Sequence, residues 1–159
     1  MAKKKPHRKA RSEYADPGKI PRSAYPLETR KQPREAPPAD PNARTPVWAF
    51  RIVDIGGPWC WTTMSAKEAE SVLRRLGSYE SMTWREIDGP TGSHGVDFGS
   101  LAKKARDRLE AIEQDDAAEY FSLRIDGPGR VWGIREEHVM RILWWDPNHE
   151  VCPSRLKHT

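Results

Sequence analysis

Cysteine and long apolar runs are scarce in this sequence. Cys60 and Cys152 are the only cysteines among 159 residues, which excludes a scaffold built on several disulfides. No apolar run approaches the roughly 20 residues that span a bilayer, and the basic first residues lack the apolar stretch of a secretory signal. Charged residues make up 31% of the chain, and the mean hydropathy is −0.84. We therefore expect a soluble cytoplasmic protein with free thiols and no membrane contact.

Basic residues and prolines are concentrated in the first 46 residues. This segment holds 12 Lys or Arg, 5 Asp or Glu, and nine of the 14 prolines. Its few large apolar residues cannot bury enough surface to offset the entropy lost on ordering. We predict a disordered basic tail over residues 1–46 and a single domain over 47–159, whose net charge is −3. The tail would either hold nucleic acid loosely through phosphates or act only as a solubilising extension.

Three short strand patterns follow one another near the C-terminus. Polar and apolar residues alternate over 119–125, a turn sequence follows at 126–129, and further strand patterns cover 130–135 and 138–145. The two glutamates between the last two patterns mark a tight reversal. Two successive hairpins predict an antiparallel meander. In a regular register, Arg130 would lie roughly opposite Trp144.

Strand and helix patterns precede this meander. They are a strand over 47–53, a returning strand over 59–63, a short helical piece around 83–86, a polar loop with His94 over 89–95, and a main helix over 97–114. Another main helix opens at the capping box Ser65-x-x-Glu68 and closes at Gly77. Its apolar stripe consists of Ala69, Val72, Leu73 and Leu76. The order predicts an α+β domain with two main helices packed on one face of a mostly antiparallel sheet.

Three polar residues whose side chains can transfer a proton or bind a phosphate lie at one end of the predicted meander: Arg124, Arg130 and His149. Cleavage of RNA requires activation of a 2′-hydroxyl, protonation of the leaving 5′-oxygen and stabilisation of a dianionic phosphorane. His149 would transfer the proton, because imidazole titrates near neutral pH. The two arginines would brace the phosphate. Alternatively, the arginines pair with acidic residues on neighbouring strands, and His149 caps a turn.

Other residues are candidates for RNA contact. Lys104 and Arg108 lie one turn apart on the second main helix. Trp144 or Trp145 would stack on a base, although tryptophans more often belong to the core. Lys157 and His158 would contribute if the C-terminal segment folds back.

A metal site is an alternative to this chemistry. Asp146, His149, Cys152 and His158 are close in sequence, and His149-x-x-Cys152 has ligand-like spacing. No Cys-x-x-Cys pair accompanies it, and a single His-x-x-Cys has little specificity. We therefore predict no metal and no other cofactor.

The order of elements over residues 97–154 is accompanied by a set of short motifs: Leu123-Arg124, Arg130-Val131, Gly133-Ile134, the Ile-Leu-Trp-Trp of 142–145 and the His-Glu-Val-Cys of 149–152. In these features the segment resembles the C-terminal half of the RelE/ParE-like toxin superfamily. Its members are small α+β proteins of bacterial toxin–antitoxin systems. Many cleave messenger RNA, usually on the ribosome and without a metal, whereas the ParE branch acts on gyrase.

The resemblance implies roles for individual residues. Arg130 falls where the family has an arginine at the start of the penultimate strand, and His149 falls near a basic or histidine position after the last strand. Cys152 stands where ribonuclease members often have a catalytic tyrosine, and Phe121 and Ser122 occupy the place of paired lysines. The leading hypothesis is a toxin with a small antitoxin partner, acting as a metal-independent endoribonuclease on messenger RNA. The alternative is a non-catalytic module of the same fold that binds a protein or nucleic acid.

Overall fold

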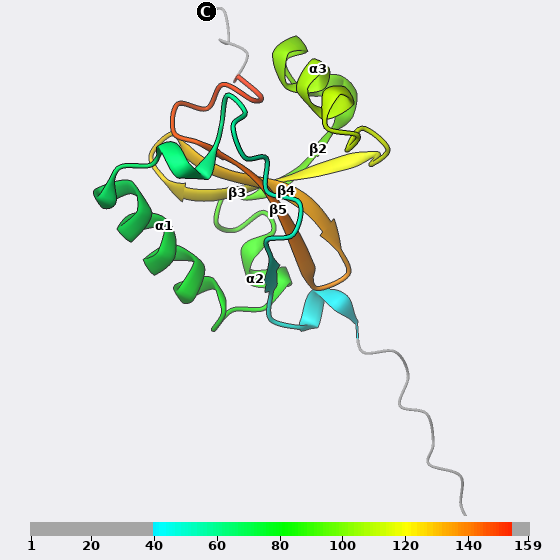
Figure 1. The fold of residues 1–159 in the computed structure, drawn as a ribbon. Coiled ribbons are helices and arrows are strands. Elements are labelled where there is room, and N and C mark those ends of the chain that lie inside the picture. The colour runs from blue at the N-terminus through cyan, green and yellow to red at the C-terminus, as the bar shows by residue number, and fades with distance from the viewer. Residues whose placement is uncertain (1–39, 154–159) are drawn as a thin grey trace, which may run out of the picture. The chain divides into compact units, whose positions relative to one another are not determined.

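The computed structural model describes residues 40–153 (Figure 1). Most of the tail predicted over residues 1–46, together with Lys157 and His158, lies outside the described residues. Structure begins before residue 47, because Pro41–Ala43 forms a 3₁₀ helix capped by Asp40. The folded part therefore starts earlier in the chain than the sequence indicates.

Five strands form one mixed sheet in the order β1-β5-β4-β3-β2. Their bounds are β1 Val47–Ala49, β2 His94–Asp97, β3 Glu119–Asp126, β4 Gly129–Glu136 and β5 Val139–Asp146. Neighbouring strands are antiparallel, except that β1 runs parallel to β5. The predicted meander is confirmed as β3, β4 and β5, and with it the α+β class.

The register between β4 and β5 differs from the predicted one. The hairpin turns at Glu137 and His138, one residue later than expected, with Glu137 at a φ of 55°. A bulge beside Trp144 then places one extra residue in β5. As a result, Arg130 lies opposite Asp146 and not opposite Trp144.

Helix α1 (Ala66–Tyr79) begins at the predicted capping box. The Ser65 hydroxyl accepts the N–H of Glu68 at 3.2 Å, and the Glu68 carboxylate accepts the N–H of Ser65 at 2.8 Å. The predicted end at Gly77 is wrong, because the helix continues to Tyr79. Tyr79 is fully buried, and its hydroxyl donates to a β3 carbonyl at 2.6 Å, which holds the last turn against the sheet.

The remaining helices are short. Helix α2 (Trp84–Ile87) confirms the short helical piece predicted around 83–86. The second main helix is shorter than predicted, since α3 covers only Lys103–Ala111, and β2 and a 3₁₀ helix at Phe98–Ser100 precede it. The predicted returning strand over 59–63 is also wrong, because Trp61–Thr63 forms a 3₁₀ helix. Across residues 40–153, no helix has the length and apolar character needed to cross a membrane.

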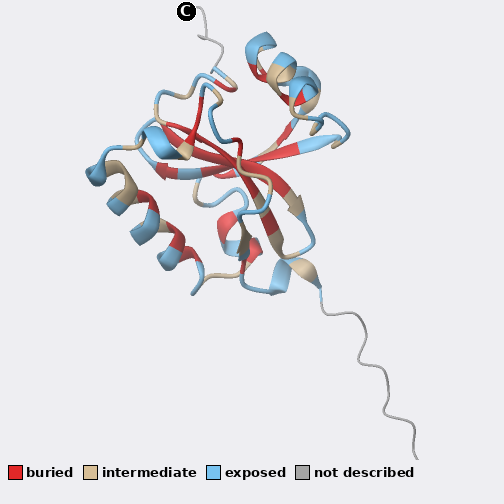
Figure 2. Ribbon diagram, viewed as in Figure 1, coloured by how far each residue is buried: buried red, intermediate tan, exposed pale blue. Residues whose placement is uncertain are grey.

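Helices α1 and α3 pack on opposite faces of the sheet (Figure 1). Val72 and Leu76 of α1 share a core with Leu123 of β3, whereas Leu109 of α3 shares another with Tyr120. Successive strand residues point to opposite faces, so these two cores lie on either side of β3. The prediction that both helices cover one face is therefore wrong. Figure 2 shows the central strands buried along most of their length.

Candidate functional site

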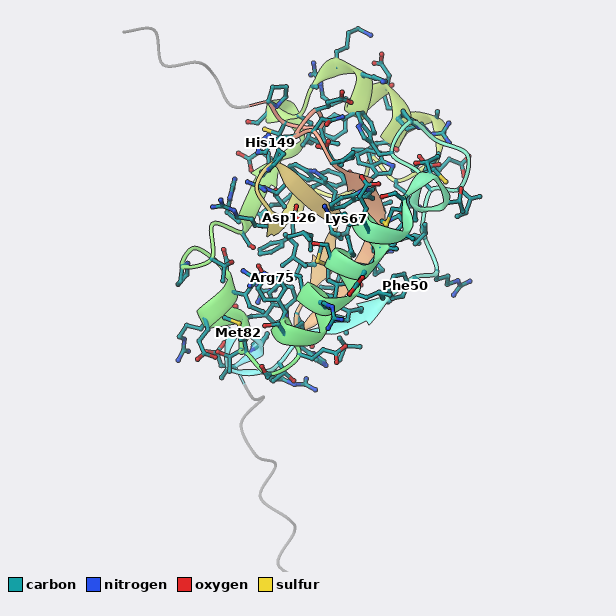
Figure 3. The ribbon with its side chains drawn as sticks, turned by 90° about the vertical axis from the view of Figure 1, so that its left-hand side faces the viewer. Phe50, Lys67, Arg75, Met82, Asp126 and His149 are labelled. Carbon is teal, nitrogen blue, oxygen red and sulfur yellow. The ribbon has the colours of Figure 1, made fainter. Side chains whose placement is uncertain are left out.

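A polar cleft lies on the α3 side of the sheet, beyond the end of β5. Its volume is about 700 Å³, and it is lined by His94, Gly99, Ser100, Leu101, His149, Cys152 and Pro153. Two histidines from distant parts of the sequence therefore line one cleft. Figure 3 shows His149 toward the end of the molecule opposite Met82. Because imidazole titrates near neutral pH, a pair of these rings is suited to moving protons.

His94 enters the cleft from the first position of β2. It pairs with Ser122 of β3 and shares a face with Val96, which belongs to the core beneath α3. The ring is exposed, and its Nδ1 lies 3.3 Å from the carbonyl oxygen of Gly92. The sequence predicts only a polar loop here, because a four-residue strand that contains glycine gives almost no periodic signal.

His149 reaches the cleft from the loop that follows β5. The side chain is half-buried, and its backbone φ of 60° lies in the left-handed region, which histidine adopts more readily than most residues. The carboxylate of Asp146 accepts hydrogen bonds from the N–H groups of Glu150 and Val151, each at 2.9 Å. The loop therefore folds back over the end of the strand.

Arg124 and Arg130 lie directly opposite each other in β3 and β4, but their environments differ. Arg124 is exposed and lies two residues beyond the β3 position that pairs with His94, on the same face. Arg130 is buried, and its Nη1 donates to the carbonyl oxygens of Gly127 and Gly129 at 2.9 Å each. Burial lowers the pKa of Arg130, and the charge of Arg124 adds to this effect. Arg130 therefore holds the β3–β4 turn, whereas Arg124 is the exposed arginine, on the face of the sheet that carries His94.

The start of α3 lies next to the cleft, because Ser100 and Leu101 line the cleft just before the helix begins. The helix begins two residues after Leu101, and its N-cap residue Ala102 provides no side-chain hydrogen bond. Lys103 and Lys104 occupy the first turn, which contains no acidic residue. Uncapped N–H groups and the helix dipole favour an anion at such a terminus. The Lys104 ammonium lies 5.2 Å from the centre of the Trp59 ring, so this predicted RNA contact also has an intramolecular partner.

The other predicted RNA contacts lie away from the cleft. Arg108 donates to both carboxylate oxygens of Asp54, at 2.8 and 2.5 Å, and Trp144 donates to the same carboxylate at 2.9 Å. Burial raises the pKa of Asp54, but these hydrogen bonds and the charge of Arg108 outweigh it and bring the pKa below its ordinary value of 3.8. Trp145 is 4% exposed and packs on the α1 side, so it has no free face for a base.

The metal alternative has no geometric support in the described part of the chain. Across residues 40–153, no three His, Cys, Asp or Glu side chains form a group that could hold a metal ion. Both carboxylate oxygens of Asp146 accept backbone N–H groups instead. Burial raises the pKa of Cys152, which disfavours its thiolate, and the sulfur lies 3.5 Å from the carbonyl oxygen of Ser100. Cys152 is therefore a lining residue and a weak nucleophile.

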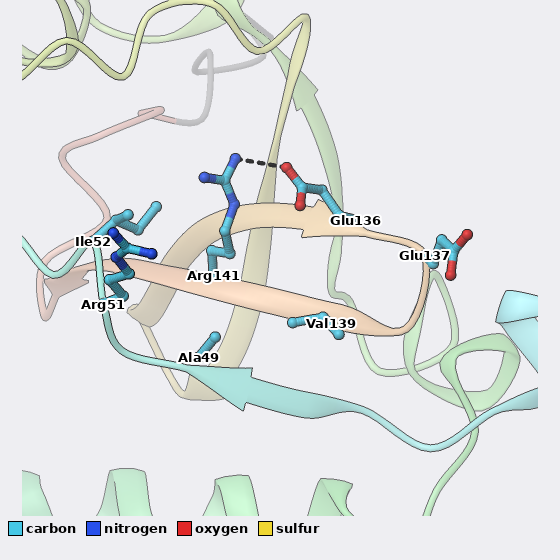
Figure 4. Close-up of a pocket in the computed structure, with 7 residues that line it drawn as sticks. All are labelled: Ala49, Arg51, Ile52, Glu136, Glu137, Val139 and Arg141. Carbon is cyan, nitrogen blue, oxygen red and sulfur yellow. Dashed lines mark ion pairs between the residues drawn. The ribbon is translucent and has the colours of Figure 1, made fainter.

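A second hollow, of about 790 Å³, lies beside β1 and the β4–β5 hairpin (Figure 4). Arg141 and Glu136, which both line it, form an ion pair of 2.7 Å, and Ala49 and Val139 contribute apolar surface. No histidine or cysteine lines this hollow. It is therefore suited to binding and lacks a group for proton transfer at neutral pH.

No protein-family model matches the chain, and neither a curated protein nor a solved structure is significantly similar to it. The chemistry of the cleft therefore carries the functional argument.

Proposed function

We propose that this domain binds RNA in the His94–His149 cleft and cleaves it without a metal, as an endoribonuclease toxin of the RelE/ParE-like kind. One observation carries the proposal: two imidazoles line a single polar cleft, with the exposed Arg124 on the face of the sheet that carries His94. The RelE/ParE-like resemblance of residues 97–154 supports the same function. A small antitoxin protein would be the natural partner.

The proposed reaction is an internal transphosphorylation. One imidazole accepts the proton of the 2′-hydroxyl while that oxygen bonds to phosphorus, and the other, as imidazolium, gives its proton to the 5′-oxygen as the bond between phosphorus and that oxygen breaks. The products are a 2′,3′-cyclic phosphate and a 5′-hydroxyl. Protons and bonds balance without a metal, an oxidant or a second substrate. DNA is not a substrate, because it lacks the attacking 2′-hydroxyl.

Negative charge accumulates on the phosphorane during this step and needs fixed positive partners. Arg124 supplies a guanidinium that is not buried, and the uncapped start of α3 supplies N–H groups and a favourable dipole. The negative net charge of the domain has little effect on a phosphate in the cleft, because charges more than about 10 Å away are largely screened by salt.

The test is cleavage of a defined RNA oligonucleotide by the purified full chain. His94→Ala and His149→Ala should each lower the rate by about 10²–10⁴, and Arg124→Ala should lower it by about 10²–10³. His138→Ala is the matched control, because this histidine lies in the β4–β5 hairpin and should leave the rate unchanged. A chelator should have no effect. Cleavage that survives the double His94→Ala/His149→Ala substitution would overturn the proposal.

The non-catalytic alternative is favoured by a different observation. Val47 and Phe50 are 47% and 50% exposed; Val47 begins the edge strand β1, and Phe50 directly follows that strand, between Ala49 and Arg51, which line the second hollow. Exposed apolar groups that cluster in this way often mark protein-binding surfaces. Growth arrest on expression that persists when both cleft histidines are replaced would favour this function over catalysis.

A further inference from the structure

Asp146 is a buried carboxylate beneath the loop that carries His149. It is the last residue of β5 and is fully buried. One carboxylate oxygen accepts the N–H of Glu150 and the other accepts the N–H of Val151, each at 2.9 Å. Both oxygens are thus committed to the backbone immediately after His149.

The same loop is fixed from a second side. Val151 is fully buried, and its carbonyl oxygen accepts the N–H of Ala102, just before α3, at 2.8 Å. The side chain of Glu150 accepts a hydrogen bond from the indole of Trp59 at 3.3 Å. The left-handed backbone of His149 is unfavourable by itself and persists only where its surroundings determine it. These contacts therefore hold the conformation that brings His149 to the cleft.

We propose that Asp146 is a positioning residue, which keeps the imidazole of His149 in the cleft with His94 by holding the N–H groups of Glu150 and Val151. This inference rests on the proposed ribonuclease function, because the position of His149 matters for catalysis only if that imidazole moves a proton. Asp146 itself does not touch the substrate, since it is buried beneath the loop.

The carboxylate is needed because both of its oxygens are acceptors. An asparagine at this position keeps the shape, but its amide nitrogen is a donor and would face one of the two N–H groups. That N–H group would lose its partner, and the loop would be released at one point. Asp146 also lies opposite Arg130 in the sheet, so its negative charge partly offsets a buried guanidinium.

The test compares Asp146→Asn with Asp126→Asn in the full chain. Asp126 is an exposed aspartate at the end of β3, outside the cleft, and serves as the matched control. Asp146→Asn should speed hydrogen exchange at the amides of Glu150 and Val151, as measured by NMR. It should also lower kcat toward an RNA oligonucleotide by up to about 10²-fold with little change in KM, as misplacement of a catalytic group does. Asp126→Asn should change neither.

A double-mutant cycle separates positioning from a merely structural role. If Asp146 acts through His149, Asp146→Asn should cost little further activity in a His149→Ala background. An equal loss in both backgrounds, or unchanged exchange at the two amides, overturns the proposal. If Asp146→Asn does not fold, Asp146→Ser, which retains one acceptor, replaces it in the same measurements.

The two proposals fail in distinguishable ways. If the parent protein does not cleave RNA, the ribonuclease function is lost, while the exchange measurement still decides whether Asp146 holds the loop. If the parent cleaves RNA and the cycle is additive, only the positioning role of Asp146 is lost.

Discussion

Asp54 is a buried side chain outside the cleft that joins three parts of the fold. Its side chain is 2% exposed and accepts hydrogen bonds from Arg108 and Trp144, which link the segment after β1 to α3 and to β5. Its carboxylate also fills the space that a side chain at position 57 would need, so Gly57 must be glycine in this conformation. A buried carboxylate in this setting makes stability depend on pH.

We predict that Asp54→Asn lowers the free energy of unfolding by about 1.5–3 kcal/mol at pH 7, as loss of hydrogen bonds to a charged group does. Because the pKa of Asp54 lies below 3.8 in the folded protein, its contribution is fully present above the unfolded-state pKa and is lost as the pH falls through the folded-state value. Urea unfolding of both proteins between pH 7 and 3 should show the difference shrinking at the acid end. Asp116→Asn, an exposed control, should stay within about 0.5 kcal/mol of the parent.

Part of the candidate site could be predicted from the sequence, namely the residues whose positions depend on their immediate neighbours in the chain. His149 lies in the loop just after β5, soon after Pro147, so its place after the meander can be read from neighbouring residues. His94 cannot be found in this way, because only its pairing with β3 brings it to the cleft. The burial of Arg130 also depends on packing against residues far away in the sequence, whereas its position in a strand can be predicted from its neighbours. A contact between residues far apart in the sequence produces no recognisable pattern in the residues that flank either of them.

At the scale of elements, local sequence patterns identify most of the helices and strands. They do not reveal which face of the sheet each helix covers. The Ser65–Glu68 capping box and the alternation in β3 reveal α1 and the meander. The polar side of β3 suggests a solvated face, as is common in antiparallel sheets. In the folded chain, α3 covers that side, and Tyr120 and Ser122 are buried there. The extra residue in β5 gives no local signal either, so the register could not be predicted.

Helix α1 allows a matched test of which leucine faces the sheet. Leu76 is 4% exposed and lies in the core, whereas Leu73 is 66% exposed, although both belong to the apolar stripe predicted from the sequence. Leu76→Ala should lower the free energy of unfolding by about 2–5 kcal/mol. Leu73→Ala should change it by no more than about 0.5 kcal/mol. Equal losses in chemical denaturation would show that the helix is rotated relative to the sheet.

At the scale of the whole molecule, the residues just before β1 connect α2 with β4. The carbonyl oxygen of Arg44 accepts the N–H of the buried Trp84, and Asp40 pairs with Arg85 at 2.6 Å. Arg135 also bonds to the side chain of Asn42. These contacts tie the segment 40–46 to α2 and β4, which the charge and proline content of the segment does not reveal.

Two truncations test this role. A chain that starts at residue 47 should melt at a lower temperature than one that starts at residue 40, because the first loses the acceptor for Trp84 and two contacts of the segment. Differential scanning calorimetry on both proteins measures the difference. Equal melting temperatures would mean that the segment rests on the domain without stabilising it.

The position of β5 between an antiparallel and a parallel neighbour has a consequence for the order of events during folding. Pairings within β3, β4 and β5 join residues close in sequence, whereas β1 pairs with β5 across most of the described chain. Long loops close at an entropic cost that is offset only after their contacts form. The meander should therefore assemble first and the edge strands later. Since His94 lies on an edge strand, the cleft arises in the last stage, and a refolding chain should bury its central tryptophans before it can bind a ligand.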